Sequence, residues 1–454
     1  MPPQGGPGRR HAPVGRGGYL MTSIGLPPPP LSPRGIVNVS DLRGETVAFC
    51  ASGGLDSCTI THWLSEQGVR VVCYTADLGQ TDETDLGQVA ERMRACGAAE
   101  AHIVPLRTEM GEAGLRAVQA QARYEGGYWN TTPLARYVTV RGILPPAMAA
   151  GVTVLSHGST GRGNDQVRFQ LATNMVAPSI EVYAPWRDQA FLDAFGGREE
   201  MIRYCTDNGL PIKPPSRSLY STDANLLGLT HEAGELESLD TPASFVEPEM
   251  GVRPTEAPDH PERVTVRFEA GRPVNIAGVP LLDAASAFEV ANEIGGRHGI
   301  GINLHLVENR FVGVKSRGVY EAPGLELLGT AYDVLLQLIL DRRARRLFDS
   351  NATFLAEQIY QGYGEDLASR LAQELAGSVA ELVTGTVTVE LYKGAVAFVS
   401  VSDAPHSLYV EEAASMSRSD AFDHKDSEGF VRVLGVGARA ASERGLVAGV
   451  LDKR

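Results

Sequence analysis

The segment Ala51–Ser57, with the sequence ASGGLDS, combines two adjacent glycines with two hydroxyl side chains. Gly53 and Gly54 let backbone N–H groups approach an oxyanion without a Cβ in the way. Ser52 and Ser57 add hydroxyl donors, and a helix that begins here directs the positive end of its dipole at the same place. This combination favours the binding of a phosphate chain. The alternative is an ordinary strand-to-helix turn in which the glycines serve only backbone geometry.

The segment matches neither of the two commonest phosphate-binding motifs. A Walker A loop needs the lysine of GxxxxGK[ST], and a dinucleotide-binding turn needs GxGxxG; the sequence after Cys50 contains neither. Any phosphate binding here must therefore depend on backbone donors, hydroxyl groups and the helix dipole.

A second polar segment, Gly158–Asp165 with the sequence GSTGRGND, places hydroxyl, amide and carboxylate groups among glycines. Arg168 follows three residues later, and a guanidinium can hold a carboxylate through two parallel hydrogen bonds. We interpret this segment as part of an amino-acid recognition site. A solvated turn is the alternative interpretation.

Alternating strand and helix patterns surround both segments. Buried strands are predicted at 46–51, 69–76, 102–106 and 152–156, with helices after the first loop and at 88–95 and 134–150. Strands that alternate with helices predict an α/β fold, in which a parallel sheet has helices on both faces. Ligands bind such sheets at the carboxyl ends of the strands, which is where both polar segments lie.

The pattern changes after about residue 214. Two antiparallel hairpins are predicted, over 263–276 and 386–401, with long helices between them. The helix over 325–340 is expected to end at a group of arginines, where the helix dipole favours cations: Arg342, Arg343, Arg345 and Arg346. The second half is therefore predicted to be a separate α+β domain.

The first 35 residues contain 9 of the 27 prolines, 8 glycines and no acidic residue. Such a segment cannot bury enough apolar surface to offset its ordering entropy, so we predict a disordered leader, with Met21 as an alternative start. The predicted division of the chain is a leader at 1–35, a nucleotide-binding domain at 36–213, a second domain at 214–425 and a C-terminal tail at 426–454.

Composition restricts the class of protein. The 454 residues are 43% hydrophobic with a net charge of −14, which is typical of a soluble protein and unfavourable for a nucleic-acid partner. No apolar run reaches the roughly 20 residues that cross a bilayer, so no membrane partner is expected. The five cysteines form no CxxC pair and no metal-ligand cluster, so we expect a cytoplasmic protein with reduced thiols and no metal ligands of its own.

Seven motifs follow the first loop in order: YTADLGQ (74–80), NTTPLAR (130–136), GSTGRGND (158–165), VRF (167–169), YSTDAN (220–225), VENR (307–310) and KSRGVYEAP (315–323). Together with SGGLDS after a buried strand, they resemble the argininosuccinate synthetase family of the PP-loop ATP pyrophosphatases, in its subclass with NTTP and YSTD motifs. The resemblance covers roughly residues 36–450.

The resemblance implies a carbon–nitrogen ligase of arginine biosynthesis (EC 6.3.4.5). It would join citrulline to aspartate with ATP through a citrulline-adenylate intermediate, giving argininosuccinate, AMP and pyrophosphate. Mg²⁺ on the phosphates is implied as well. The implied architecture is a PP-loop nucleotide-binding domain followed by an α+β synthetase domain, in a homotetramer stabilised by the C-terminal tail.

The resemblance also assigns roles to individual residues. It implies ATP contacts from Cys50, Ala51, Ser52, Gly53, Gly54, Leu55, Asp56, Ser57, Cys58, Ala76, Gly158, Thr160, Asp165 and Asp223. It implies citrulline contacts from Tyr128, Asn164, Arg168, Ser221, Thr230, Glu232, Glu308 and Tyr320. It implies aspartate contacts from Thr132, Thr160, Asn164 and Asp165, with Thr160 and Asp165 as catalytic residues.

Taken singly, several of these residues have simpler interpretations. An interior tyrosine such as Tyr128 is more often part of a core than of a ligand site. Ser221 and Asp223 could cap a helix, and each glutamate could form a surface salt bridge. Ala76 suits close approach of adenine to a strand end, although a plain strand end would look the same.

One departure from the family pattern falls in the phosphate loop. Many relatives have SGGLDTS, whereas Ser57 and Cys58 occupy the last two positions here. Serine keeps a hydroxyl, but a thiol is a weaker donor than the hydroxyl it replaces. We therefore expect slightly weaker ATP binding and no loss of activity.

Three other functions are compatible with parts of this sequence. A PP-loop tRNA-modifying enzyme would share ASGGLDS but needs a basic RNA-binding face, which the net charge of −14 disfavours. A nucleotide-sensing protein would have no reason to retain GNDQVRF, Glu308 and Tyr320. A relative acting on another ureido or amidino acid stays open, because the same residues would serve it.

Overall fold

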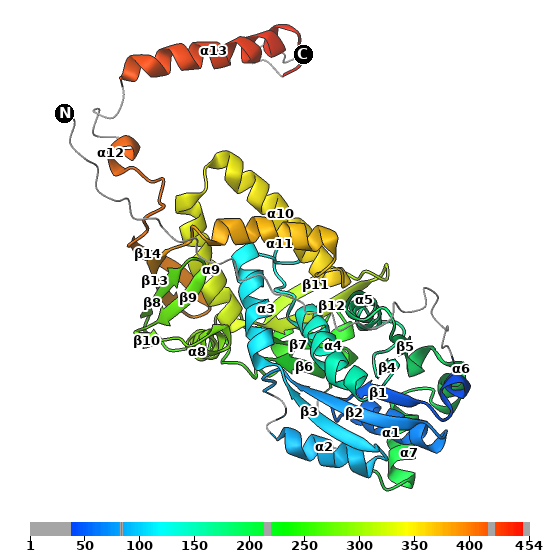
Figure 1. Cartoon of the computed structure of the whole chain (residues 1–454). Coiled ribbons are helices and arrows are strands. Elements are labelled where there is room, and N and C mark those ends of the chain that lie inside the picture. The colour runs from blue at the N-terminus through cyan, green and yellow to red at the C-terminus, as the bar shows by residue number, and fades with distance from the viewer. Residues whose placement is uncertain (1–37, 82, 84, 213–218, 416–422, 448–454) are drawn as a thin grey trace, which may run out of the picture.

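A five-stranded parallel sheet forms the first half of the chain (Figure 1). The computed structural model describes residues 38–81, 83, 85–212, 219–415 and 423–447, so the predicted leader at 1–35 lies outside the described residues. The strand order is β3-β2-β1-β4-β5, with bounds β1 Thr46–Cys50, β2 Arg70–Asp77, β3 Glu100–Pro105, β4 Val154–His157 and β5 Glu181–Tyr183. The predicted α/β fold and its four strands are confirmed, and β5 was missed.

Helices cover both faces of this sheet because successive strand residues point to opposite sides. Val47 and Phe49 join one buried cluster, whereas Ala48 joins another. The helices of this half are α1 Leu55–Glu66, α2 Leu86–Ala95, α3 Arg107–Ala120, α4 Thr131–Ala149, α5 Asp165–Val176, α6 Gln189–Ala194 and α7 Arg198–Asp207. The first cluster includes apolar residues of α1, α2 and α7, and the second those of α4 and α5.

A second, antiparallel sheet of five strands lies in the other half, in the order β10-β9-β8-β13-β14. Its strands are β8 Glu262–Glu269, β9 Arg272–Ile276, β10 Val279–Pro280, β13 Gly385–Tyr392 and β14 Ala395–Ser402. Both predicted hairpins are present, and β8 pairs with β13 to join them into one sheet. Inward-facing Val264, Val266 and Phe268 alternate along β8 and pack in the largest core, with residues of α3, α8 and α9.

A third sheet, whose strands come from two separate stretches of the chain, lies beside the parallel sheet. Its order is β11-β12-β7-β6, with β6 Ser221–Asn225, β7 Gly228–Glu232, β11 Leu304–Asn309 and β12 Lys315–Glu321. The motif YSTDAN therefore forms an edge strand and not the helix N-cap that was its simpler interpretation. Tyr320 pairs with Thr230 across β12 and β7, which brings residues about ninety positions apart in the chain into register.

The remaining helices are α8 Ala284–Arg297, α9 Pro323–Ile339, α10 Arg342–Gln361, α11 Leu367–Ala380, α12 Glu411–Ala414 and α13 His424–Glu443. The arginines at 342–346 were expected to end the helix over 325–340, and this prediction is wrong because they begin α10. Asp341 caps α10 by accepting hydrogen bonds from two backbone N–H groups. Arg345 is neutralised by Asp333 and Asp349, each at 2.8 Å, so a cation near a helix start is tolerated.

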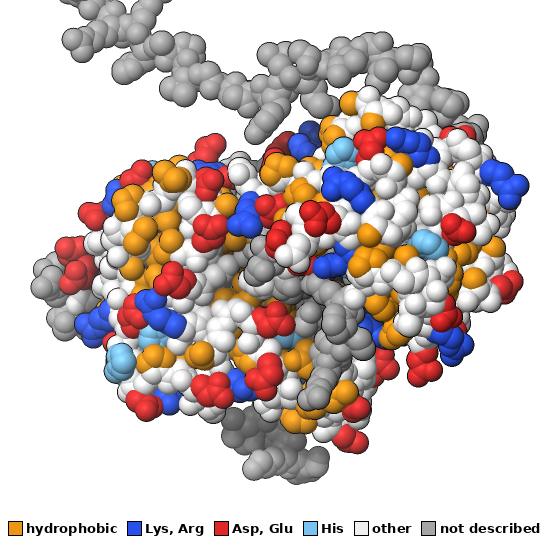
Figure 2. Space-filling view, turned by 90° about the horizontal axis from the view of Figure 1, so that it is seen from below, with side chains coloured by type: hydrophobic (Ala, Val, Ile, Leu, Met, Phe, Trp, Pro, Cys, Tyr) orange, Lys and Arg blue, Asp and Glu red, His pale blue; other side chains and the backbone are white. Residues whose placement is uncertain are grey.

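The surface and the C-terminal region carry two further observations. On the face shown in Figure 2, acidic and basic side chains are interspersed and do not form one large basic patch. Helix α13 extends away from the body of the molecule (Figure 1). Within the described ranges, no helix is both long and apolar enough to span a membrane.

Candidate active site

The phosphate-loop candidate connects β1 to α1 at the carboxyl edge of the parallel sheet. The backbone N–H of Ser52 donates to Ser57 Oγ at 3.0 Å, and the two hydroxyl oxygens lie 3.2 Å apart. Gly54 is the N-cap of α1 and has no side-chain cap hydrogen bond. The first N–H groups of α1 are therefore available at an exposed turn, which is the arrangement that binds anions at helix N-termini.

Gly53 has a structural role that the sequence did not reveal. Its φ is +78°, and a Cβ built on it would lie 2.7 Å from Val89 Cγ1 of α2. Arg92, also on α2, donates to the Gly53 carbonyl oxygen at 2.9 Å. This bond holds the Gly53 carbonyl oxygen against α2.

The rest of the loop residues flank this turn. Cys50 ends β1, Ala51 donates its N–H to the Tyr74 carbonyl, and Leu55 begins α1. Cys58 is fully buried in α1, so its thiol packs inside the domain and does not face the open side of the loop. Ala76 lies near the end of the neighbouring strand β2, where Gln80 Nε2 donates to its carbonyl oxygen at 2.9 Å.

The loop before α5 lies beside the start of α1. A Cβ built on Gly158 would lie 3.4 Å from Asp56 Cβ, and Trp186 Nε1 donates to Asp56 Oδ1 at 3.1 Å. Burial raises the pKa of Asp56 above its usual value. Thr160 is exposed in this loop. The two polar segments that the sequence singled out are therefore adjacent at one edge of the sheet.

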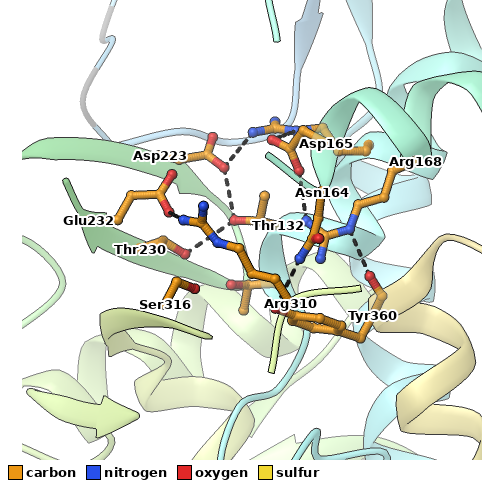
Figure 3. A network of polar contacts seen from close by, with 12 residues as sticks. Thr132, Asn164, Asp165, Arg168, Asp223, Thr230, Glu232, Arg310, Ser316 and Tyr360 are labelled. Atoms are coloured by element: carbon orange, nitrogen blue, oxygen red, sulfur yellow. Dashed lines mark hydrogen bonds and ion pairs between the residues drawn. The ribbon is translucent and has the colours of Figure 1, made fainter. Parts of the chain in front are cut away.

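Arg136 connects the parallel-sheet half to the third sheet by binding Asp165 and Asp223, both labelled in Figure 3. Its Nε lies 2.9 Å from Asp165 Oδ2, and its Nη2 lies 2.6 Å from Asp223 Oδ2. Asp165 begins α5, Asp223 lies on β6, and Arg136 itself is on α4. One guanidinium therefore holds together two carboxylates from separate elements, α5 and β6.

Asp165 is bound by a second arginine. Arg168 Nη1 lies 2.7 Å from Asp165 Oδ1, and its Nε donates to the Tyr360 carbonyl oxygen at 2.9 Å. Burial alone would raise the pKa of Asp165, but Arg136 and Arg168 outweigh it and hold this pKa at about 2. Asp165 is therefore ionised at neutral pH. Arg168 is buried, and its Nη1 and Nε contact Asp165 and the Tyr360 carbonyl oxygen.

Hydroxyl groups surround the shared Asp223 carboxylate. Thr132 Oγ1 donates to Asp223 Oδ2 at 2.8 Å and lies 3.1 Å from Thr230 Oγ1. The N–H of Thr132, in the first turn of α4, donates to the Tyr128 hydroxyl at 3.0 Å. Asn164, before α5, donates its Nδ2 to the Tyr360 hydroxyl at 3.0 Å, and its Oδ1 is buried without a hydrogen-bond partner among the described residues.

A cluster of stacked aromatic rings lies beside these hydroxyl and amide groups. Tyr128 stacks on Tyr320 with ring centroids 4.1 Å apart, and Tyr124 stacks on Tyr360 at 3.7 Å. Tyr320 is buried and donates to Glu308 Oε2 at 2.8 Å. Ser316 donates to the other Glu308 oxygen at 3.1 Å, so both carboxylate oxygens of Glu308 are occupied.

Glu232 is the last residue of β7 and is exposed. Its nearest cation is Arg310, with Nη2 to Oε2 at 3.8 Å. Burial of the carboxyl group, together with Asp165, Asp223 and Glu308, raises the pKa of Glu232 to about 7, while Arg310 opposes the shift. Ser221 pairs with Glu232 across β6 and β7 and is exposed at the sheet edge.

The structure thus brings most of the predicted residues into two adjacent groups, one at the phosphate loop and one around Arg136. Ser221 and Thr160 lie at the rim of these groups, and Cys58 lies behind them. Sequence reasoning missed four contributors: Arg92, Arg136, Arg310 and Tyr360. Arg136 and Arg310 lie inside the quoted motifs NTTPLAR and VENR, so the motifs already contained the signal.

Comparisons with known proteins match nearly the whole described chain. The family model for the arginosuccinate synthase N-terminal HUP domain matches residues 46–211, and that for the arginosuccinate synthase C-terminal domain matches 220–441. An argininosuccinate synthase from Rhodopirellula baltica is 42% identical over 397 residues, covering 87% of this chain and 97% of the relative. One from Thermotoga sp. strain RQ2 is 38% identical, with coverages of 86% and 95%.

Among solved structures, a U34-tRNA thiolase from Methanococcus maripaludis overlaps 40% of this chain and 64% of its own at 14% identity. The TM-score of that overlap is 0.24, which is too low to favour a related activity.

Proposed function

The chain belongs to the argininosuccinate synthase family, and on that premise we propose that its cleft joins citrulline to aspartate through a citrulline-adenylate intermediate. It is accordingly an ATP-dependent carbon–nitrogen ligase of arginine biosynthesis. The observation that supports the proposed route is the adjacency of an anion-binding turn at Ser52–Ser57 and a cluster of paired charges around Arg136.

The chemistry explains why both regions are needed. The ureido carbon of citrulline is a poor electrophile, because two nitrogens donate electron density into it. Transfer of AMP to the ureido oxygen creates a good leaving group, and the aspartate amine can then attack. The protein mainly has to align three polar molecules and stabilise the charge that develops on phosphate.

We propose that ATP binds across the phosphate loop and the neighbouring strand ends. The residues assigned to it are the loop 50–58, Ala76, Gly158, Thr160, Asp165 and Asp223. The exposed N-terminus of α1 supports a phosphate role for Ser52–Ser57. The buried thiol of Cys58 contributes through packing, so the substitution of thiol for hydroxyl there should have little effect on ATP.

Mg²⁺ is part of this proposal only as a component of the nucleotide substrate. No group of three or more His, Cys, Asp or Glu that could hold a metal occurs in the described part of the chain. The residues therefore do not fit a dedicated metal site, and we propose that the ion enters with the phosphates of ATP.

For the amino acids, we propose that citrulline contacts the stacked tyrosine rings and the carboxylates around them. Its assigned residues are Tyr128, Asn164, Arg168, Ser221, Thr230, Glu232, Glu308 and Tyr320. The carboxylates of Glu308 and its neighbours suit an α-ammonium group and the ureido N–H groups. Aspartate is assigned to Thr132, Thr160, Asn164 and Asp165, where the unpartnered Asn164 Oδ1 is a ready acceptor for its ammonium.

The pKa of Asp165 restricts its proposed catalytic role. A carboxylate with a pKa of about 2 is a very weak base, so it cannot take a proton efficiently at neutral pH. We propose that Asp165 and Thr160 act by orienting aspartate and, for Asp165, by holding Arg136 and Arg168 in place.

We propose the division of the chain at about 213, which agrees with the gap between the two family matches. The tail at 426–454 is proposed to make a homotetramer. Phe430, Val433 and Leu434 of α13 are exposed at between 62% and 74%, which is the pattern of a helix whose apolar face packs against another subunit. A cytoplasmic location is also proposed, because all five cysteines are free.

Isotope transfer tests the route. Citrulline labelled with ¹⁸O in the ureido group should deliver the label to AMP and none to pyrophosphate, because the oxygen that attacks the α-phosphate leaves with phosphorus. Unlabelled AMP would rule out the citrulline-adenylate. Pyrophosphate release over a panel of ureido and amidino acids tests the substrate, and citrulline with aspartate should exceed every other pair.

A further inference from the structure

The second half of the proposed reaction needs a proton acceptor. At neutral pH the α-amino group of aspartate is an ammonium ion, which has no lone pair with which to attack the adenylated carbon. A base must remove one proton before the carbon–nitrogen bond forms, and a well-placed base contributes roughly 10²–10⁴-fold to the rate. The function proposed above names no such group.

Three of the four carboxylates around the cleft are already engaged. Asp165 receives one arginine on each oxygen, and Asp223 Oδ2 receives Arg136 and Thr132. Glu308 receives a hydroxyl on each oxygen. A carboxylate whose oxygens are held by donors is poorly suited to take a proton, because protonation would break those bonds.

Glu232 differs from these three in its contacts. Among the described residues it receives no hydrogen bond at its carboxylate, and its nearest cation, Arg310, stands at 3.8 Å. Half of its side chain is exposed. It ends β7 two residues beyond Thr230, and Figure 3 shows it on the same side of the sheet as Thr132 and Asp223.

We propose that Glu232, assigned to citrulline above, does not bind citrulline and is instead the general base that deprotonates the α-ammonium of aspartate. This inference rests on the proposed function. The ammonium gives one proton to the Glu232 carboxylate, and the freed lone pair forms the bond to the adenylated carbon. The bond from that carbon to oxygen then breaks, and AMP leaves with its electron pair. The nitrogen loses its second proton to the AMP phosphate as the guanidinium forms, and Glu232 returns its proton to solvent.

The electrostatic surroundings of Glu232 suit this role. The charged groups that face it are Asp165 of α5, Asp223 of β6, and Glu308 and Arg310 of the hairpin β11–β12. Partial burial and the three acidic groups raise its pKa to about 7, which matches a base that works near neutral pH. The nearby His157 is buried, and burial lowers its pKa to about 3, so it is a much weaker base. His231 is fully buried against Glu321 and cannot reach the cleft.

Two partial reactions distinguish a base from a citrulline-binding group. In the Glu232→Gln variant, mixing enzyme with ATP and citrulline without aspartate should give the same burst of pyrophosphate as the unmodified enzyme, because adenylation needs no amine. Formation of argininosuccinate after aspartate is added should fall by about 10²–10⁴-fold. The matched control is Glu235→Gln on the adjacent 3-10 helix Gly234–Glu237, which should change neither step.

Two results would overturn the proposal. A pyrophosphate burst reduced as strongly as product formation would assign Glu232 to citrulline binding. Product formation within threefold of the unmodified rate would show that no base was lost. If the unmodified enzyme itself forms no argininosuccinate, the proposed function fails and not the assignment of the base. Thermal unfolding of Glu232→Gln should be unchanged, because the substitution is nearly isosteric at a half-exposed site.

The pH dependence provides a second measurement. Deprotonated Glu232 is the active form, so the rate of product formation should fall as pH decreases through about 7. Arg310→Gln removes the cation that lowers this pKa, and the acidic limb should therefore move to higher pH. An acidic limb that stays at the same pH in Arg310→Gln and persists in Glu232→Gln would contradict the proposal.

Discussion

The phosphate loop and the cleft around Arg136 are built in different ways, although they lie next to each other. The loop consists of consecutive residues, and its serine hydroxyl contacts join positions five apart, although Arg92 and Trp186 also donate to it from elsewhere in the chain. The cleft joins Arg136 to Asp165 and Asp223, which lie 29 and 87 positions away. One site is local and uses backbone donors, whereas the other is assembled from side-chain charges on separate elements.

This difference determines how each region should respond to substitution. Changing one residue of the loop alters the approach of a ligand or the packing of one turn. Changing one member of the charge network leaves its partners buried without compensation, which costs more than the lost contact itself. The cleft should therefore couple stability to activity more strongly than the loop does.

Arg136→Met should have the largest effect. It leaves Asp165 and Asp223 facing each other without their shared cation, and we expect roughly 2–4 kcal/mol loss of unfolding free energy and a large loss of ligase activity. This estimate lies toward the low end for a broken buried pair because 20% of the arginine side chain reaches solvent. Urea unfolding measures the first quantity and argininosuccinate formation the second.

The double variant Arg136→Met, Asp223→Asn is the control for that prediction. Removing the charge of Asp223, which loses its cation partner, should restore about 1 kcal/mol or more of stability without restoring activity, because Asp165 keeps Arg168. If the two substitutions were simply additive, the ion pair would contribute little, and the contrast between the two regions would be lost.

The two glycines of the loop provide a matched pair. Gly54→Ala has room, because the nearest atom to its new Cβ is Ser52 Oγ at 3.6 Å, so it should fold normally and raise KM for ATP about tenfold. Gly53→Ala combines a φ of +78° with a 2.7 Å contact to Val89, so it should also lose about 1–3 kcal/mol of stability. Equal melting temperatures for the two variants would show that α2 shifts enough to relieve this contact.

The network should also determine part of the acid sensitivity. The pKa of Asp165 is lowered to about 2, so the stability that it contributes is present above about pH 4 and is lost as pH falls toward 2. This amounts to about 2 kcal/mol. Asp165→Asn should therefore unfold with a shallower dependence on pH in this window, measured by urea titration at several pH values. An unchanged slope would mean that the two arginines do not favour the ionised form.

The smallest expected effects come from single hydroxyl groups, one in each region. Tyr360→Phe removes the acceptor for Asn164 Nδ2, and Ser57→Ala removes the acceptor for the Ser52 N–H. Each should cost about 1 kcal/mol of unfolding free energy. Tyr360→Phe should raise KM for an amino acid and Ser57→Ala should raise KM for ATP; the opposite pattern would contradict the assignment of the two regions.

The local parts of the protein were predictable from the sequence. The strand, glycine turn and helix around Ser52–Ser57 are consecutive, so hydrophobic pattern and turn chemistry were sufficient to place them. The hairpin over 386–401 was predicted for the same reason, because its alternation and its Lys393-Gly394 turn are local signals. The ordered motifs identified the family, since each motif is contiguous.

Helix ends were less predictable. By charge alone, the arginines at 342–346 fit the end of one helix better than the start of the next, because the helix dipole favours cations at the C-terminus. Asp341 decides between them by capping α10, and Arg345 obtains its partners from both helices. Only the packed pair of helices shows that those acidic partners are within reach.

The sequence by itself determined the order of elements, the chemistry of the phosphate turn and the identity of most residues in the cleft, because these depend on neighbours along the chain. The tertiary structure alone decided that Arg136 holds both Asp165 and Asp223 and that Gly53 packs on α2. It also decided that Glu232 receives no hydrogen bond from the described residues, while the carboxylates around it are engaged. The physical reason is distance in space: burial and Coulomb interactions between residues far apart in the chain set a side chain's pKa and its partners, and no local pattern records them.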